Sequence, residues 1–112
     1  MCLFCKIAHK ETPAKLLFET DDIVAFSDIN PVAPTHALVI PKKHIESLND
    51  ANEEDAALLG ELLLAAKRAA HEAGLEKAGW RAVVNNGAGA GQSVFHVHVH
   101  VLGGRTMTWP PG

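Results

Sequence analysis

The sequence predicts an α+β fold, with a mostly antiparallel sheet of about five short strands, one long helix and a short N-terminal helix. Residues 53–74 carry apolar side chains at the spacing of a long amphipathic helix. Short apolar and β-branched runs lie on both sides of that helix, bounded by turn-forming residues. Because neighbouring runs are close in sequence, we expect hairpin connections and a single domain over residues 1–112.

The first forty residues predict one short helix and three strands. Residues 2–9, CLFCKIAH, place apolar side chains on one face at helical spacing. The runs 15–20 and 21–29 meet at a polar turn and predict a hairpin. A proline-rich turn then leads into residues 36–41, HALVIP, a strand that ends at a proline.

The long helix and two further strands complete the predicted fold. Asn52 is a residue type that caps helix N-termini, and Gly74 stands where a left-handed residue would end the helix. An apolar stripe that includes Leu63 is expected to pack on the sheet. Residues 80–86 and 94–102 predict two paired strands, joined by the flexible glycine-rich loop GAGAGQS.

Composition narrows the function classes. Hydrophobic residues make up 47% and charged residues 21%, an ordinary globular composition. The formal net charge of −3 supplies no basic field for a nucleic-acid backbone, although a small phosphorylated ligand needs only a local site. No stretch approaches the roughly 18 apolar residues of a membrane span, and the N-terminus lacks a secretory signal. Two cysteines at Cys-x-x-Cys spacing are typical of a reducing compartment, so we expect a cytoplasmic protein without nucleic-acid or membrane partners.

The most informative motif is GAGQSVFHVHVHVLGG, residues 89–104. His96, His98 and His100 alternate with valines, so on a strand all three would face one side. At a rise of roughly 3.3 Å per residue the outer two α-carbons lie about 13 Å apart, too far for three rings to share one tetrahedral zinc ion easily. Two neighbouring rings could share one. The plain alternative is a half-buried polar face, and three histidines in register after a glycine-rich loop argue against it.

A division of labour among the three rings is the favoured interpretation. The middle ring, His98, has a nitrogen lone pair at neutral pH and can attack phosphorus, forming an intermediate that water later hydrolyses. Its neighbours can donate to phosphoryl oxygens or move a proton. The preceding loop is neither a Walker loop nor a dinucleotide fingerprint. Its glycines still permit close backbone approach to an anion, and Gln92 and Ser93 stand at its end.

With these motifs in view, the sequence resembles a known family. HVHVHVL, residues 96–102, is similar to the His-φ-His-φ-His-φ-φ signature of the histidine triad superfamily. GQSVFH before it, GGR and WPPG after it, and FSDINPVAPTHALVIPKKHI upstream resemble its histidine triad nucleotide-binding (Hint) branch, over nearly the whole chain. The resemblance implies a homodimer with a continuous sheet. It also implies a purine nucleoside phosphoramidase and adenylate hydrolase that releases AMP or GMP and needs no cofactor for catalysis.

The resemblance also implies roles for single residues. His98 matches the nucleophile that becomes nucleotidylated. Ser93 and His100 match catalytic groups beside the phosphate and the leaving amine, and His36 matches a histidine that supports the triad. Asp28 matches the carboxylate that accepts hydrogen bonds from the ribose. The purine slot, the phosphate loop and a tryptophan that reaches the partner subunit's site complete the expected nucleotide contacts: Leu3, Phe4, Ile7, Phe26, Ile29, Asn85, Gly91, Gln92 and Trp109.

Without the resemblance these residues have plainer interpretations. Phe26 and Ile29 are ordinary core residues, Asp28 forms a turn, and Trp109 anchors the tail. Two other functions also stay open beside the phosphoramidase. One is a non-catalytic nucleotide-binding or protein-interaction module, and the other is a dinucleoside polyphosphate hydrolase.

The opening CLFC sets this chain apart from many Hint proteins. Members with this Cys-x-x-Cys resemble zinc proteins that add two histidines as ligands. Such a four-coordinate set is typical of structural rather than catalytic zinc, and the alternative is two free thiols. A bound zinc would make His96 part of the scaffold instead of a proton donor. The matching set here is Cys2, Cys5, His44 and His96.

Overall fold

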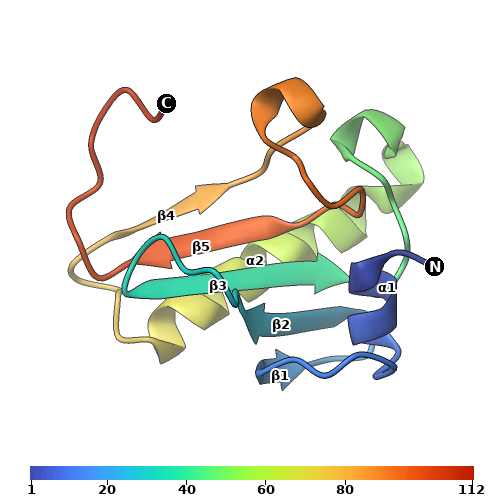
Figure 1. Ribbon diagram of the computed structural model, residues 1–112, viewed down its shortest axis with the longest axis horizontal. Coiled ribbons are helices and arrows are strands. Elements are labelled where there is room, and N and C mark those ends of the chain that lie inside the picture. Colours follow the sequence, from blue (N-terminus) through green and yellow to red (C-terminus); the bar gives the residue numbers. More distant parts are fainter.

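The computed structural model describes residues 1–112 and confirms the expected α+β architecture (Figure 1). Two helices and five strands carry the fold, and short 3₁₀ turns lie between some of them. One such turn, Glu53–Asp55, leads directly into the long helix. The elements in chain order are α1 Leu3–Ala8, β1 Leu16–Glu19, β2 Ile23–Ser27, β3 Thr35–Pro41, α2 Ala56–Glu72, β4 Trp80–Val83 and β5 Val99–Gly103.

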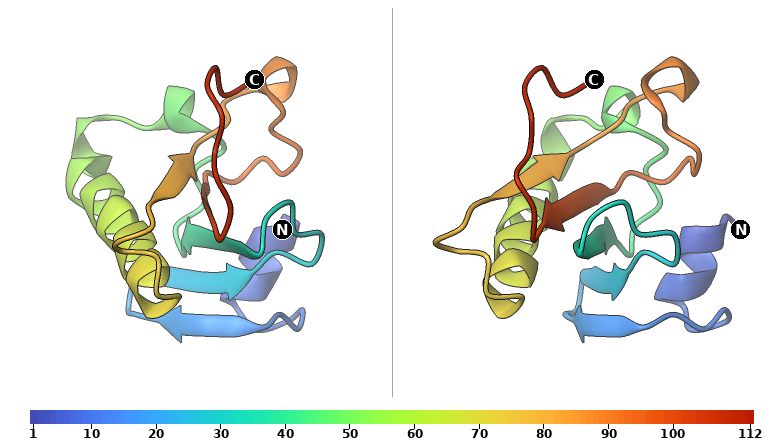
Figure 2. Two further views of the ribbon diagram at one scale, coloured as in Figure 1. Left: turned by 90° about the vertical axis from the view of Figure 1, so that its left-hand side faces the viewer. Right: turned by 60° about the vertical axis from the view of Figure 1, so that its left-hand side comes forward.

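The five strands form one antiparallel sheet in the order β1-β2-β3-β5-β4. The β1–β2 hairpin and the β4–β5 pair are as expected, and β5 enters the sheet beside β3. Helix α2 covers one face of the sheet, while α1 lies on the other side at one end of β2 and β3 (Figure 2). Neither helix combines the length and apolar character that a membrane span requires.

Alternation along β2 gives the sheet two apolar faces. Ile23 and Ala25 belong to the core under α2. Val24 and Phe26 belong to a second core on the opposite face, together with Phe4 from α1. A strand buried on both faces reads as an unbroken apolar run, which explains why β2 shows no polar alternation.

Helix α2 is fixed at its start by a capping box between Asn52 and Asp55. The Asn52 side chain accepts from the Glu54 N–H at 3.0 Å, and the Asp55 carboxylate accepts from the Asn52 N–H at 3.1 Å. The expectation that Leu63 packs on the sheet was wrong, since Leu63 is 56% exposed. The phase of the expected stripe is otherwise correct, because four of its members are buried together with Ala65, and these mostly small side chains let the helix lie close to the sheet: Leu62, Ala65, Ala66, Ala69 and Ala70.

The histidine motif is only partly a strand. β5 begins at Val99, so His96 and His98 lie in the segment before it, and the expectation of one strand through the whole motif was wrong at its N-terminal end. Two contacts replace the ladder there. The Val97 N–H donates to a carbonyl in the connection after β3 at 2.6 Å, and the His96 ring donates to the Pro41 carbonyl at 2.7 Å. The segment is therefore held by the end of β3 without extending the sheet.

Candidate functional site

A pocket of about 280 Å³ opens beside the histidine segment, between α1, the turn after β2 and the start of β5. One side of the pocket is apolar. The rest of the lining is polar and carries one carboxylate, three hydroxyls, one carboxamide and two imidazoles. The structure thus brings together most of the nucleotide contacts expected from the sequence: Leu3, Phe4, Ile7, Phe26, Asp28, Ile29, Ser93, His98 and His100.

Aromatic contacts fix the apolar side. Phe4 meets Phe26 edge-on with ring centroids 5.5 Å apart, and it meets the His98 ring edge-on at 5.0 Å. Phe4 and Phe26 are buried, whereas Ile29 is 88% exposed. The slot therefore has a packed floor and an exposed apolar rim, an arrangement that suits a flat heterocycle.

The backbone fixes the orientation of His98. Its Nδ1 lies 2.7 Å from the carbonyl oxygen of His96. A carbonyl can only accept, so Nδ1 carries the proton and Nε2 keeps its lone pair. Burial lowers the pKa of His98 below its usual range. The ring is therefore neutral at pH 7 and has a nucleophilic nitrogen.

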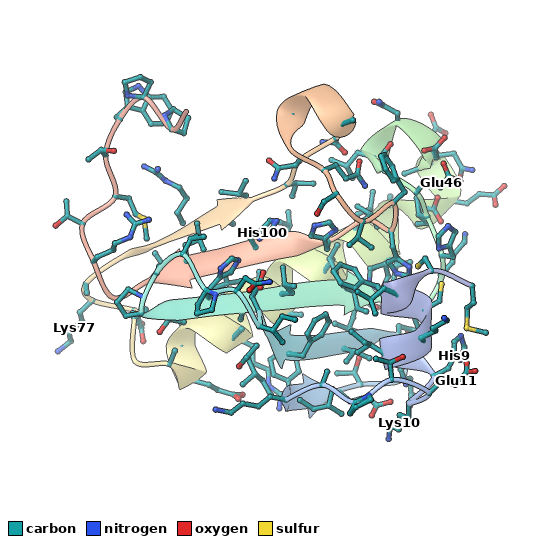
Figure 3. All side chains as sticks on the ribbon, viewed as in Figure 1. His9, Lys10, Glu11, Glu46, Lys77 and His100 are labelled. Carbon is teal, nitrogen blue, oxygen red and sulfur yellow. The ribbon has the colours of Figure 1, made fainter.

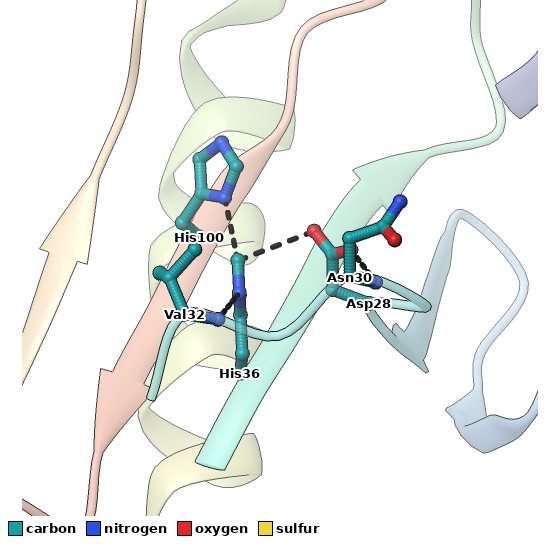
Figure 4. A network of polar contacts seen from close by, with 5 residues as sticks. All are labelled: Asp28, Asn30, Val32, His36 and His100. Carbon is teal, nitrogen blue, oxygen red and sulfur yellow. Dashed lines mark hydrogen bonds and ion pairs between the residues drawn. The ribbon is translucent and has the colours of Figure 1, made fainter. Parts of the chain in front are cut away.

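A group of polar side chains lies behind the pocket (Figure 4). His36 Nδ1 accepts from the Val32 N–H at 3.1 Å, so the proton of the neutral ring is on Nε2. That Nε2 lies 2.9 Å from His100 Nδ1 and 3.3 Å from Asp28 Oδ2. The other carboxylate oxygen, Asp28 Oδ1, accepts from the Asn30 N–H at 2.8 Å. We name this group the proton chain: Asp28, His36 and His100.

His100 is held neutral at the pocket end of the proton chain. Burial lowers its pKa to about 4, the positive charges that His98 and His36 can carry add to this, and the Asp28 carboxylate opposes it. Since its Nδ1 faces the N–H of His36, the proton of His100 lies on Nε2, which points away from His36 (Figure 4). His100 therefore offers the pocket a hydrogen-bond donor. His36 does not line the pocket and acts behind His100.

The glycine-rich loop turns at two glycines with positive φ, and its expected flexibility stays a prediction. Gly87 and Gly91 adopt φ of 90° and 94°, a conformation that other residues rarely tolerate. The Gln92 carboxamide accepts from the Gly87 N–H at 2.8 Å. It also donates to the carbonyls of Glu46 and Val94, at 2.6 and 3.1 Å. These contacts engage both polar atoms of the carboxamide and brace the loop, and Gln92 does not line the pocket, so its phosphate contact stays a prediction.

Other expected contacts lie outside the pocket of this chain. Asn85 lies just before the glycine-rich loop and Gly91 lies within it, and neither residue lines the pocket. Trp109 is 82% exposed on the C-terminal tail. The Arg81 guanidinium donates to the Thr108 carbonyl at 2.8 Å and holds this tail beside β4. A contact between Trp109 and nucleotide would therefore need a second copy of the chain.

A second group of side chains lies between α1 and the connection after β3. It consists of two cysteines and two histidines. Each cysteine sulfur lies 3.2–3.5 Å from each histidine Nδ1, and the two Nδ1 atoms lie 3.2 Å apart. His9, at the outer end of α1, belongs to neither group of histidines (Figure 3). We name this second group the thiol cluster: Cys2, Cys5, His44 and His96.

The spacings in the thiol cluster fit a tetrahedral zinc ion. Zinc at about 2.3 Å from sulfur and about 2.0–2.1 Å from nitrogen separates sulfur from nitrogen by about 3.5 Å and two nitrogens by about 3.3 Å. His96 donates its Nε2–H to the Pro41 carbonyl at 2.7 Å, so its Nδ1 lone pair faces the thiols. Burial raises the pKa of the Cys5 thiol, and a bound cation would reverse this by stabilising the thiolate.

Sequence reasoning missed part of the pocket and all of the backbone groups that set the ring tautomers. The Thr12-Pro13 break after the first helix was a usable signal, because a turn there must pass the apolar slot. The roles of the Val32 N–H and the Pro41 carbonyl could not be predicted from residue type. Every residue except proline has a backbone N–H, and every residue has a backbone carbonyl. The lining residues that were missed are Thr12, Pro13, Ala14, Ser27, Asn30, Leu38 and Val94.

Known proteins resemble this chain over nearly its whole length. A family model described as HIT domain matches residues 9–107. The crystal structure of a HIT family hydrolase from Legionella pneumophila is 55% identical, with a TM-score of 0.98 and coverage of 100% of both chains. An uncharacterized HIT-like protein of Synechocystis sp. is 52% identical over 110 residues, 98% of this chain and 96% of the relative. A histidine triad nucleotide-binding protein from Candida albicans is 34% identical, with a TM-score of 0.82 over 90% of this chain and 73% of its own.

Proposed function

The chain belongs to the HIT domain family, and on that basis we propose that it hydrolyses purine nucleoside 5′-phosphoramidates, or acyl-adenylates, through a nucleotidylated histidine. The observation that carries the proposal is the orientation of His98. Its Nδ1–H is held by a backbone carbonyl, which leaves Nε2 as a nucleophile in a pocket with an apolar slot. A relative named as a hydrolase supports the proposed hydrolysis, and a relative named as a nucleotide-binding protein supports the proposed nucleotide substrate.

The pocket suggests how the nucleotide lies. The purine occupies the apolar slot at Phe4 and Phe26, and the ribose hydroxyls donate to Asp28. The α-phosphate then lies between Ser93 and the two imidazoles of the pocket. In the proposed cytoplasmic homodimer, the tail of one subunit brings Trp109 to the site of the other.

Bond cleavage begins at His98. Its Nε2 lone pair attacks the α-phosphorus as the P–N bond breaks. The leaving nitrogen takes a proton that solvent supplies through the Ser93 hydroxyl, and it departs as a neutral amine. The His100 Nε2–H donates to a phosphoryl oxygen and stabilises the charge that develops there. The imidazole of His98 is then bonded to phosphorus through Nε2 and keeps its proton on Nδ1.

Water completes the cycle. A water oxygen bonds to phosphorus, the P–Nε2 bond breaks, and its electron pair returns to the His98 ring. The nucleoside monophosphate leaves and one proton passes to solvent. The ring regains its neutral form without rotating, because the His96 carbonyl holds Nδ1–H throughout.

We propose that the thiol cluster holds a structural zinc. The ion would fix the Cys2–Cys5 end of α1 against the connection after β3. The same helix carries Phe4, so the cluster supports the floor of the purine slot. All four protein ligands are used, which leaves no open position for substrate.

Single-turnover trapping tests the function. Wild type mixed with adenosine 5′-phosphoramidate and quenched within one turnover should carry a nucleotidyl adduct, detected by intact mass. His98→Ala should form no adduct and lose at least about 10³-fold in kcat, because the nucleophile is gone. Ser93→Ala should form the adduct more slowly.

His71→Ala is the matched control, because His71 is exposed on α2 and far from the pocket lining. It should keep wild-type turnover. Wild type that forms no adduct and does not turn over the phosphoramidate would disprove the enzyme and leave a binding module. Faster turnover of diadenosine tetraphosphate than of the phosphoramidate would reassign the chain to the polyphosphate hydrolases.

A further inference from the structure

The proton chain contains one hydrogen atom with two acceptors. In neutral His36 the proton is on Nε2, because Nδ1 accepts from the Val32 N–H. That Nε2 lies 2.9 Å from His100 Nδ1 and 3.3 Å from Asp28 Oδ2 (Figure 4). The contact with His100 is a hydrogen bond and the contact with Asp28 is a longer ion-pair distance, so His100 is the preferred acceptor and the carboxylate is the alternative one for the same N–H.

The competition determines what His100 presents to the pocket. When His36 donates to His100 Nδ1, the proton of His100 must be on Nε2, and a phosphoryl oxygen meets a donor. When His36 turns its N–H toward Asp28, the hydrogen bond to His100 Nδ1 is lost, and nothing then fixes the proton of His100 on Nε2. A His100 that presents an Nε2 lone pair repels a phosphoryl oxygen.

Asp28 is also placed to bind the sugar. Its carboxylate lines the pocket and its side chain is 18% exposed. Oδ1 is engaged by the Asn30 N–H at 2.8 Å, so Oδ2 is the oxygen shared between the pocket and His36. A hydroxyl that donates to Oδ2 takes up acceptor capacity and weakens the hold of the carboxylate on the His36 proton.

We propose that Asp28 is a specificity-determining residue that couples ribose recognition to the tautomer of His100. Ribose hydroxyls bound to Asp28 commit the His36 proton to His100, and His100 then donates to the phosphoryl group. Only hydrogen bonds are exchanged, and no covalent bond is made or broken. The kinetic consequence rests on the proposed phosphoramidase function, whereas the coupling itself needs only a bound nucleotide.

Sugar variants of the substrate test the coupling through kcat. In wild type, a 2′-deoxy or 3′-deoxy adenosine 5′-phosphoramidate should lower kcat by about fivefold or more and raise KM as well. In Asp28→Ala no carboxylate competes for the proton. The ratio of kcat between ribose and deoxyribose substrates should therefore fall to about one, while KM for the ribose substrate rises. Asp21→Ala, at an exposed turn aspartate, should keep the wild-type ratio.

Nitrogen-15 spectra of the histidine rings test the coupling without turnover. AMP should convert His100 to one form, with Nε2 protonated, and the deoxy nucleotide whose substrate reacts slowly should leave a mixture. Deoxy substrates that raise KM alone, with the same His100 spectrum in both complexes, would overturn the coupling. A sugar-dependent His100 spectrum in a chain that turns over no phosphoramidate would instead overturn the proposed function and leave the coupling standing.

Discussion

The thiol cluster and the proton chain each hold two imidazole nitrogens about 3 Å apart, at 3.2 and 2.9 Å, yet they suit opposite chemistry. In the thiol cluster the far nitrogen of His96 faces the Pro41 carbonyl and must donate, so the near nitrogen is free to bind a cation. In the proton chain the far nitrogen of His36 faces the Val32 N–H and must accept, so the near nitrogen has a proton to give. One backbone group therefore decides whether a histidine pair suits a metal or a proton.

The comparison also separates two sites that look alike by composition. The proton chain places two imidazoles and a carboxylate within 4.8 Å of one another, a set that can ligate a metal. Metal binding at His36 Nε2 would move the ring proton to Nδ1, where it would meet the Val32 N–H. Two donors would then face each other, which disfavours the metal-bound form.

The largest expected effect comes from breaking the proton chain alone. His36→Ala should lower kcat by about 10²–10³, the range of positioned proton donors, because His100 loses the group that sets its tautomer. Zinc content by elemental analysis should match wild type. A variant that lost zinc together with activity would show that the two groups are not separate.

Breaking the thiol cluster alone should remove the zinc and leave kcat nearly unchanged. Cys5→Ser should lose zinc, and its unfolding free energy should fall by about 2.7 kcal/mol if zinc saturates wild type at 100 times its Kd. KM should rise, because α1 carries Phe4, whereas kcat should change little. Urea unfolding, zinc analysis and steady-state kinetics measure the three quantities. Metal-free wild type would remove the zinc assignment altogether.

The backbone N–H of Val32 provides a further test of how the proton chain differs from the thiol cluster. Val32→Pro removes the N–H that donates to His36 Nδ1, so the ring proton can leave Nε2. We expect kcat to fall about tenfold, equal to one hydrogen bond of about 1.4 kcal/mol. Val32→Ala keeps the N–H and should behave as wild type. Equal kcat in the two variants would contradict the assigned tautomer.

The last expected effect is on the pH dependence of stability. The pKa of His100 is about 4 in the folded chain, while an unfolded histidine binds its proton below about 6.5. The unfolded state therefore binds more protons between these values, and stability should fall as the pH drops through that window. Against His100→Gln, the extra slope in urea titrations should be at most about 1.4 kcal/mol per pH unit. Equal slopes would mean that His100 is not held neutral.

Local patterns predicted much of the fold. The β1–β2 hairpin, the long helix and the pairing of β4 with β5 follow from apolar periodicity and turn residues. The start of β5 did not follow, because the end of its ladder depends on contacts between His96 and Pro41, 55 residues apart. The phase of α2 was predicted correctly at Leu62 and Ala69 but the buried stripe was expected to be too wide at Leu63, since periodicity gives a stripe and the sheet decides how much of it is buried.

The candidate site was predictable in its side chains but not in their protonation. The spacing of the three histidines predicted a division of labour, and the family resemblance assigned separate roles to His96 and His98. The pocket brings the expected apolar residues to His98. The bracing contacts of the buried Gln92 carboxamide were not predicted, because they depend on loop and backbone groups that no local motif specifies. The tautomers depend on backbone atoms, which the sequence does not encode by residue type.

The strand order has a consequence for synthesis of the chain. β5 is the last strand made, yet it lies beside β3, and Cys2 and His96 are 94 residues apart. The contacts that create both histidine groups therefore form only after residues 96–100 have been made. A truncated chain that lacks β5 would leave β3 with an unpaired edge, which is a template for aggregation. Prematurely terminated chains should accordingly be insoluble and not compete for nucleotide.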